Sequence, residues 1–310
     1  NRPVSLKAVI ELISAPDAKV KLSSGEAISV ISARELLVPV DRERVIESGI
    51  VSIADSAQIE ESLKLVIPSN KNVLTKSEMM ILDLIANYNW ERPIYFVAMG
   101  GDLGIGIRDY LEFNGFAYKF VPIKSNTSMG KPGRVNAKEM YHNVMNVYRW
   151  GNMNDSTVNI DYQNLFTFGA STSVRNIHTQ TAKALVLEGE REKAVEVLDR
   201  MQEVMIPSQF PLNFSLVPSL NEYAVMESID IYLLAGEREK ALALGDAFVE
   251  ESFDSLRLFA NMYRAGGYSQ NDIENCLSYL IYVADIYRNR GLEKEANELE
   301  SEVEQFLAAI

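Results

Sequence analysis

Aromatic side chains alternate with amide and carboxylate groups in two stretches of the chain, a mixture typical of sugar or peptide contact. Flat rings stack against a ligand, while amides and carboxylates orient it through hydrogen bonds. The candidates for such a ligand groove are Tyr110, Glu112, Tyr118, Tyr141, Trp150 and Asn152. The alternative interpretation is a packing seam between domains, which the usual burial of aromatic side chains favours.

Residues suited to autonomous catalysis are sparse. The two histidines, His142 and His178, lie far apart, and no carboxylate or cysteine motif accompanies them as a metal site or triad requires. We interpret both as surface or structural residues. The acid pairs at 60–61 and 250–251 are expected to be solvated helix faces, because adjacent residues point in different directions. The sequence predicts no catalytic residue and no metal site.

A glycine-rich segment from 99 to 106 lies between an expected strand and an expected helix, where helix amides could hold a phosphate. Its glycines do not follow the order G-x-G-x-x-G, and no P-loop lysine and hydroxyl follow them. We therefore interpret the segment as a tight turn that uses glycine for backbone geometry. No cofactor is predicted.

Composition narrows the classes of partner. The formal net charge is −13, so the chain lacks the basic surface that nucleic-acid binding requires, and nucleic acid is excluded as a partner. The single cysteine, Cys276, allows no internal disulfide, and its apolar neighbours indicate a packed side chain. No stretch approaches the roughly 18–20 apolar residues of a membrane-spanning helix.

The first part of the chain predicts a small α/β domain at 1–135. Its helices are expected at 6–13, 79–89 and 105–113, and its strands at 19–23, 27–32, 36–40, 62–68, 93–97 and 117–123. Thr75 and Glu78 form the sequence signature of a capping box at the start of the second helix. The order helix, strand, helix, strand favours parallel pairing. A polar segment at 125–133 is the expected linker.

The second part, 136–310, is predicted to be a tetratricopeptide-like stack of helical hairpins, an α-solenoid. Gly-Glu-Arg-Glu-Lys-Ala at 189–194 recurs letter for letter at 236–241, and a looser copy occupies 291–296. Each copy follows one apolar-periodic helix and opens another. We expect the glycine to end a helix where a β-carbon would crowd, and the alanine to allow close helix packing. The predicted fold class is α+β, predominantly α.

Several strings occur in order along the chain, and the most specific is Trp90-Glu91-Arg92-Pro93-Ile94-Tyr95-Phe96. The others occupy 38–41, 49–51, 74–76, 81–86, 115–123 and 150–152. Together with the repeats, the series resembles the soluble C-terminal region of a family of large bacterial polytopic membrane proteins. The N-terminal part of that family is a domain of unknown function, classed with protein O-mannosyltransferase-like glycosyltransferases.

This resemblance implies a non-catalytic accessory domain that helps to hold a protein or glycan acceptor. It further implies a place on the extracytoplasmic, periplasmic side of a bacterial inner membrane, with the protein's own membrane domain as a partner. No catalytic residue is carried over, because the family's presumed catalytic loops lie outside this chain. The alternative is a free-standing tetratricopeptide-like adaptor that binds a peptide in its concave groove. An autonomous soluble enzyme is the third class considered, and no nucleophile–base or metal set supports it.

Overall fold

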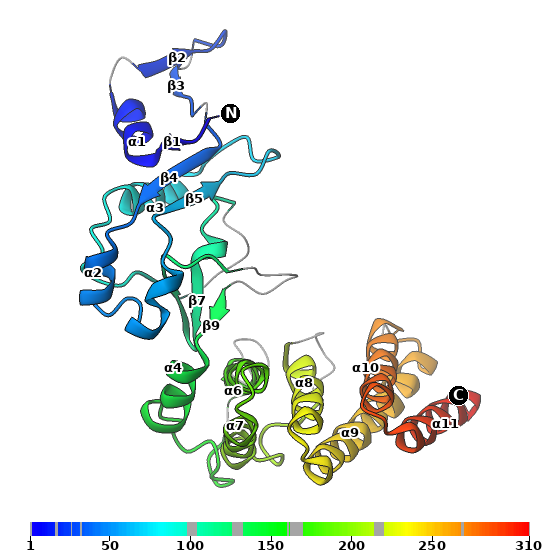
Figure 1. Cartoon of the computed structure of the whole chain (residues 1–310). Helices are drawn as coiled ribbons and strands as arrows, with labels where there is room; N and C mark the ends of the chain where they lie inside the picture. Colours follow the sequence, from blue (N-terminus) through cyan, green and yellow to red (C-terminus); the bar gives the residue numbers. More distant parts are fainter. Residues whose placement is uncertain are drawn as a thin grey trace. The chain divides into compact units, whose positions relative to one another are not determined.

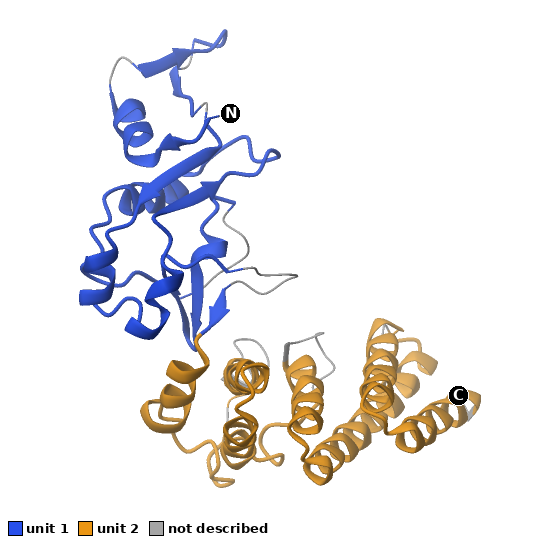
Figure 2. Ribbon diagram, in the orientation of Figure 1, with its two compact units in different colours: residues 1–135 blue, residues 136–310 orange. Residues whose placement is uncertain are grey.

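The computed structural model of the chain describes most of its residues. The described residues are 2–15, 18–25, 27–31, 33–97, 104–125, 133–159, 161, 170–213, 220–267 and 270–309. Two compact units divide the chain, the N-terminal unit at 1–135 and the helical unit at 136–310 (Figure 2). The expected linker at 125–133 lies largely outside the described residues.

The N-terminal unit contains three small sheets and short helices (Figure 1). The strands are β1 (Val4–Ser5), β2 (Lys19–Lys21), β3 (Ala27–Ser29), β4 (Glu35–Pro39), β5 (Ser62–Val66), β6 (Tyr95–Phe96), β7 (Leu111–Asn114), β8 (Ala117–Phe120) and β9 (Arg134–Val135). The helices are α1 (Leu6–Ser14), α2 (Arg42–Glu47) and α3 (Lys76–Ala86), with 3₁₀ turns η2 (Ile53–Gln58) and η3 (Arg108–Tyr110).

Strand pairing in this unit is mostly antiparallel. The first sheet has the order β1-β4-β5, the second is the hairpin β2-β3, and the third has the order β6-β8-β7-β9. Only the β1–β4 and β7–β9 pairs are parallel among the described strands. The predicted parallel pairing of the strands near 95 and 120 is therefore wrong, because β6 pairs with β8 antiparallel.

The helix predicted at 105–113 is also wrong. Residues 108–110 form only a 3₁₀ turn, and Leu111–Asn114 form β7, which pairs antiparallel with β8. A two-residue loop at 115–116 joins the strands, and its first residue, Gly115, has φ +66°. Glycine at the first central position is the requirement of a type II′ hairpin turn, so this local signal favours the hairpin over the helix.

Two anchors fix the core of the N-terminal unit. The predicted capping box opens α3, since the Thr75 hydroxyl accepts from the Glu78 amide and the Glu78 carboxylate accepts from the Thr75 amide. Trp90 is 1 % exposed and stacks on Phe120, although its φ is +61°. A non-glycine residue in that region is strained, so its packing in the core must hold it there.

The helical unit consists of consecutive helices. They are α4 (Ala137–His142), the π-helical turn η4 (Asn143–Val147), α6 (Ala170–Leu187), α7 (Arg191–Val204), α8 (Leu220–Ala235), α9 (Arg238–Arg264), α10 (Gln270–Asn289) and α11 (Glu293–Ala309). The pairs α6/α7, α8/α9 and α10/α11 are hairpins, and α8 packs on both α6 and α10. The three repeat copies therefore build hairpins that pack side by side.

Each repeat copy forms the same helix end. Gly189, Gly236 and Gly291 have φ between +76° and +94°, and the amide after each glycine donates to the carbonyl five residues earlier. This is the Schellman cap, which needs a left-handed residue. The predicted crowding is wrong, because a β-carbon at these glycines would meet nothing within 4 Å. Their positive φ is the reason for glycine.

The alanine of each copy behaves as expected. Ala194, Ala241 and Ala296 are fully buried on the helices that follow the caps. Small buried residues let two helices approach closely, and this repeats in all three hairpins. The predicted fold class, α+β and predominantly α, is confirmed. Within the described ranges, every helix is too short or too polar to span a lipid bilayer.

Candidate functional site

Tyr110, one of the predicted groove residues, belongs to the core of the N-terminal unit. Its side chain is 2 % exposed, and its hydroxyl accepts a hydrogen bond from the Lys64 amide at 2.9 Å. Burial raises the pKa of the Tyr110 hydroxyl. Tyr110 thus ties η3 to β5 and presents no open ring face. Tyr118 is half-buried and packs on Phe113 across the β7–β8 pair, with ring centroids 5.6 Å apart.

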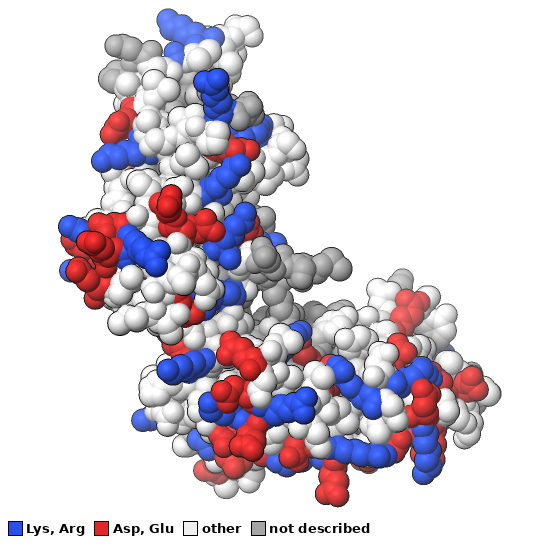
Figure 3. Space-filling model, viewed as in Figure 1, with Lys and Arg blue, Asp and Glu red and all other residues white. Residues whose placement is uncertain are grey.

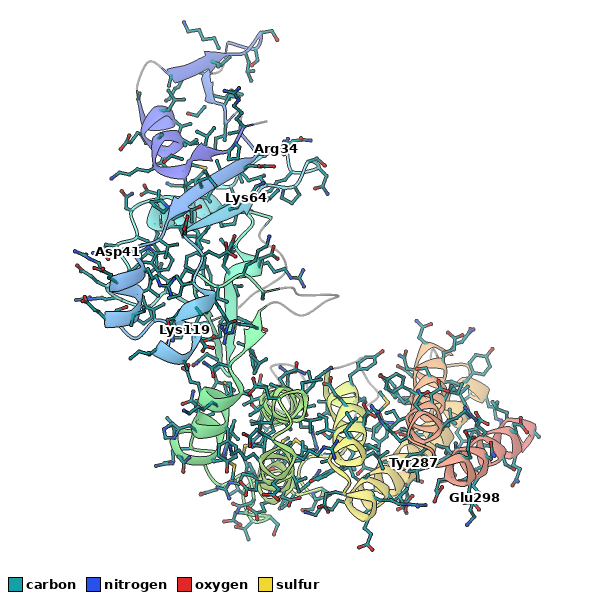
Figure 4. The ribbon with its side chains drawn as sticks, in the orientation of Figure 1. Arg34, Asp41, Lys64, Lys119, Tyr287 and Glu298 are labelled. Carbon is teal, nitrogen blue, oxygen red and sulfur yellow. The ribbon has the colours of Figure 1, made fainter. Side chains whose placement is uncertain are left out.

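Glu112 lies in a row of charged side chains that crosses the third sheet. The strand register places Lys119 and Arg134 on either side of Glu112, on neighbouring strands (Figure 4 labels Lys119). Glu112 is 4 % exposed and pairs with the Arg134 Nε at 3.2 Å, while Arg134 also reaches Asp55 at 3.3 Å. This ion pairing fastens β9 and η2 to β7. Lys119 and Arg134 were not predicted, because their alignment becomes visible only once the hairpin is known.

In the helical unit, Tyr141 joins two helices. Its hydroxyl donates to the Glu196 carboxylate of α7, and this hydrogen bond, more than burial, raises the pKa of the Tyr141 hydroxyl. The ammonium of Lys193 lies 5.9 Å from the Tyr141 ring centroid. Tyr141 therefore supports the packing of α4 beside α7.

Trp150 and Asn152 line one cavity within the helical unit. The cavity has a volume of about 310 Å³ and lies between the segment after η4 and the C-terminal half of α7. We call it the Trp150 pocket. Its lining residues are Met145, Tyr148, Arg149, Trp150, Gly151, Asn152, Met153, Asn154, Arg200 and Val204.

Aromatic contacts fix the Trp150 ring. Its centroid lies 4.7 Å from the ring of His178 in α6, and the Tyr148 ring meets it edge-on at 5.7 Å. His178 is fully buried, its Nδ1 bonds the Val174 carbonyl at 2.8 Å, and its Nε2 has no hydrogen-bond partner among the described residues. Burial lowers the pKa of His178 to about 4, so its ring is neutral at pH 7. The Trp150 indole therefore packs against the neutral imidazole of His178.

The polar groups of the Trp150 pocket are amides and arginines. Asn152 and Asn154 are exposed, and Gly151, with φ +64°, turns the chain between the indole and the first amide. Arg200 pairs with Glu203 at 3.1 Å, and Arg149 donates to the Asn146 carbonyl at 3.1 Å. Among the lining residues that the structure describes there is no carboxylate, histidine, cysteine or serine, so these residues offer stacking and hydrogen bonding without a nucleophile or general base.

A buried charge cluster was not predicted. Glu251 of the acid pair at 250–251 is half-buried and accepts from the Leu212 and Asn213 amides at 2.6 and 3.0 Å, so its expected full solvation is wrong. Burial raises the pKa of Glu251. Arg175 of α6 is fully buried and donates to the Phe210 carbonyl at 2.7 Å. These contacts hold the segment before α8 between α6 and α9, which is a structural role.

The end of the glycine-rich segment is a tight turn, as expected, and residues 99–103 lie outside the described residues. Gly104 and Gly106 have φ +63° and +78°. A β-carbon at Gly106 would lie 2.2 Å from the Val66 amide nitrogen, so only glycine fits against β5. In the described part of the chain, no group of three His, Cys, Asp or Glu side chains is placed to hold a metal ion.

The chain was compared with curated proteins, solved structures and family models. No curated protein and no solved structure matches the chain. A family model does match, over the N-terminal unit and the first residues of α4, and its description states no ligand or reaction. Residues 1–139 match the family model of TMEM260-associated domain 2.

Proposed function

We propose that the chain is a non-catalytic binding module whose Trp150 pocket holds a carbohydrate acceptor. The observation that carries this proposal is the fixed indole of Trp150 beside the exposed amide of Asn152 in one cavity. The carbon–hydrogen faces of a sugar ring stack on an indole, and amides and guanidinium groups bond its hydroxyls. Because His178 and Tyr148 hold the ring in place, little side-chain entropy is lost on binding.

The proposal includes a setting for this module. We place it on the extracytoplasmic side of a membrane, as an accessory region of a glycosyltransferase-like protein whose own membrane domain is its partner. One observation supports this setting: the strings at 90–96 and 115–123 and the others in the same order resemble the soluble region of such membrane proteins. The accessory role agrees with a pocket whose described lining residues supply stacking and hydrogen-bonding groups but no general base.

Calorimetric titration with a panel of neutral oligosaccharides tests the pocket. We expect Trp150→Ala to weaken binding of a recognised glycan about tenfold or more, because stacking and burial are lost. Asn152→Ala should weaken it by about 1 kcal/mol, the net value of one hydrogen bond. Tyr263→Ala is the matched control, since Tyr263 is an exposed aromatic residue of α9 that does not line the pocket.

Equal affinity of the wild type and Trp150→Ala would contradict a carbohydrate site in this pocket. Hydrolysis or transfer of any glycan by the isolated chain would contradict the non-catalytic part of the proposal. Sequencing upstream of Asn1 tests the setting, which fails if the full reading frame encodes no membrane helix.

A peptide-binding adaptor is the second candidate, and a separate observation favours it. Several large apolar side chains of the stacked hairpins are exposed, among them Tyr223, Leu258, Met262, Ile281 and Tyr282. Apolar side chains on stacked helices are the usual contact groups for a bound peptide. A peptide from an immobilised library that is lost with Tyr282→Ser and retained with Trp150→Ala would favour this function over the first.

A further inference from the structure

A second cavity, in the N-terminal unit, concentrates positive charge in an acidic protein. It has a volume of about 270 Å³ and lies beside β5 and η3. We call it the Arg108 pocket. Its lining residues are Lys64, Val66, Pro68, Gly106, Arg108, Asp109 and Lys124. Three of the four charged side chains described in its lining are cations, although the whole chain has a formal net charge of −13.

The three cationic side chains of this cavity differ in whether a carboxylate of the protein already neutralises them. Lys64 on β5, labelled in Figure 4, pairs with Glu35 at 2.7 Å, so part of its charge is compensated. Arg108 is half-buried, and Lys124 is exposed. Within the described stretches of the chain, neither side chain forms a hydrogen bond or an ion pair, whereas the Arg108 carbonyl accepts from the Leu111 amide. In the face shown in Figure 3, Lys and Arg side chains of the N-terminal unit are interspersed with Asp and Glu side chains.

Backbone contacts hold the walls of the cavity together. The Asp109 carbonyl accepts from the Ser125 amide at 2.7 Å and from the Ser125 hydroxyl at 3.0 Å. The segments that carry Arg108 and Lys124 are therefore fastened side by side. Gly106 rests against the backbone of Val66, which places η3 beside β5 and thus near Lys64. The cations come from three separate segments of the chain that the fold brings to one place.

We infer that the Arg108 pocket binds the phosphate group of a small ligand. A guanidinium group offers several N–H donors to phosphate oxygens, and a lysine adds a mobile point charge. Asp109 also lines the cavity, and its carboxylate repels an anion, which limits affinity. The size of the cavity suits a single phosphate with a small attached group. This site lies outside the Trp150 pocket and does not depend on the function proposed for it.

Titration calorimetry of the whole chain tests the inference with inorganic phosphate and with glucose 6-phosphate. We expect Arg108→Gln to weaken binding about tenfold, because a charge-assisted hydrogen bond is lost. Arg92→Gln is the matched control, since it removes the same charge from an exposed position of the same unit and should change affinity less than about twofold. Asp109→Asn should tighten phosphate binding, because it removes the carboxylate that repels the anion. A variant that failed to fold could not bind more tightly than the wild type.

A parallel arm identifies the source of the phosphate. Vesicles of phosphatidylcholine with and without phosphatidic acid present the same group on a membrane. Capture by phosphatidic acid that is lost with Arg108→Gln, without binding of the soluble esters, supports a lipid headgroup, and the reverse supports a soluble ester. The inference is overturned if Arg108→Gln and Arg92→Gln bind alike, or if the wild type binds none of these probes.

Discussion

His178 shows how burial alone sets the chemistry of a side chain. It lies in α6 beneath Trp150, fully buried, with Arg175 and Arg200 adding repulsion to any proton it would take up. These causes lower its pKa from an ordinary value of 6.5 to about 4. The residue therefore serves as a neutral aromatic surface, and protonation works against the folded state.

Acid should destabilise the protein through His178. The unfolded chain takes up the proton near pH 6.5 and the folded chain only near pH 4, so this stabilisation is complete above pH 6.5 and is lost as pH falls toward 4. At pH 5 the loss is about 2 kcal/mol. The difference between the free energies of unfolding in urea at pH 7 and at pH 5 measures this loss.

The second histidine provides the control for this measurement. His178→Gln should remove that part of the pH dependence, whereas His142→Gln, at an exposed position, should retain it. A pH dependence that is the same in His178→Gln and in the wild type would show that His178 is not the group responsible. Glu251, whose pKa is raised, contributes a pH dependence of the opposite sign to the free energy of unfolding. This contribution is present in both variants, so it cancels when the pH dependence of one variant is subtracted from that of the other.

At the scale of elements, the turn before η3 requires glycine at position 106, because its backbone lies against the backbone of β5. Gly106 and Gly49 both have positive φ, +78° and +70°, but only Gly106 lies against another strand. Gly49→Ala should cost about 1 kcal/mol for the left-handed conformation alone. Gly106→Ala adds a clash with the Val66 backbone and should cost at least about 3 kcal/mol. The shift in the denaturant midpoint measures both, and equal shifts would contradict the contact.

Elements with local signals were predictable from the sequence. The capping box at Thr75 and the three repeat copies carry their own hydrogen-bonding chemistry, and the structure forms both. The β7–β8 hairpin was missed because the apolar residues near 105–113 fit a helical period equally well. The turn chemistry of Gly115 was the better guide.

The sites were less predictable than the elements. Trp150 and Asn152 share a cavity because they are close in sequence. Tyr110 and Glu112 face inward, which only the strand assignment reveals. The Arg108 pocket draws on residues from 64 to 124, so no spacing along the chain indicates it.

At the scale of the whole molecule, the two units have separate cores. The cluster that contains Leu36, Leu82 and Phe120 lies entirely within the N-terminal unit. The helical unit has its own buried residues, such as Val197 and Leu280. Each unit falls within the usual size range of a domain.

Each unit should therefore fold by itself. We expect the fragment 136–310 to keep a helical circular dichroism spectrum and to unfold cooperatively on heating, because its hairpins pack on one another. The fragment 1–135 should keep its sheet signature. A fragment 136–310 without a cooperative transition would contradict a self-sufficient helical unit.

The chain has only two tryptophans, and one lies in each unit. Trp90 is sealed in the apolar core of the N-terminal unit, whereas Trp150 lines an open cavity of the helical unit. An indole in an apolar core emits at shorter wavelength than one in contact with water. The intrinsic fluorescence of the unmodified protein thus carries two separable reporters, one for the integrity of the sheets and one for events at the helical cavity.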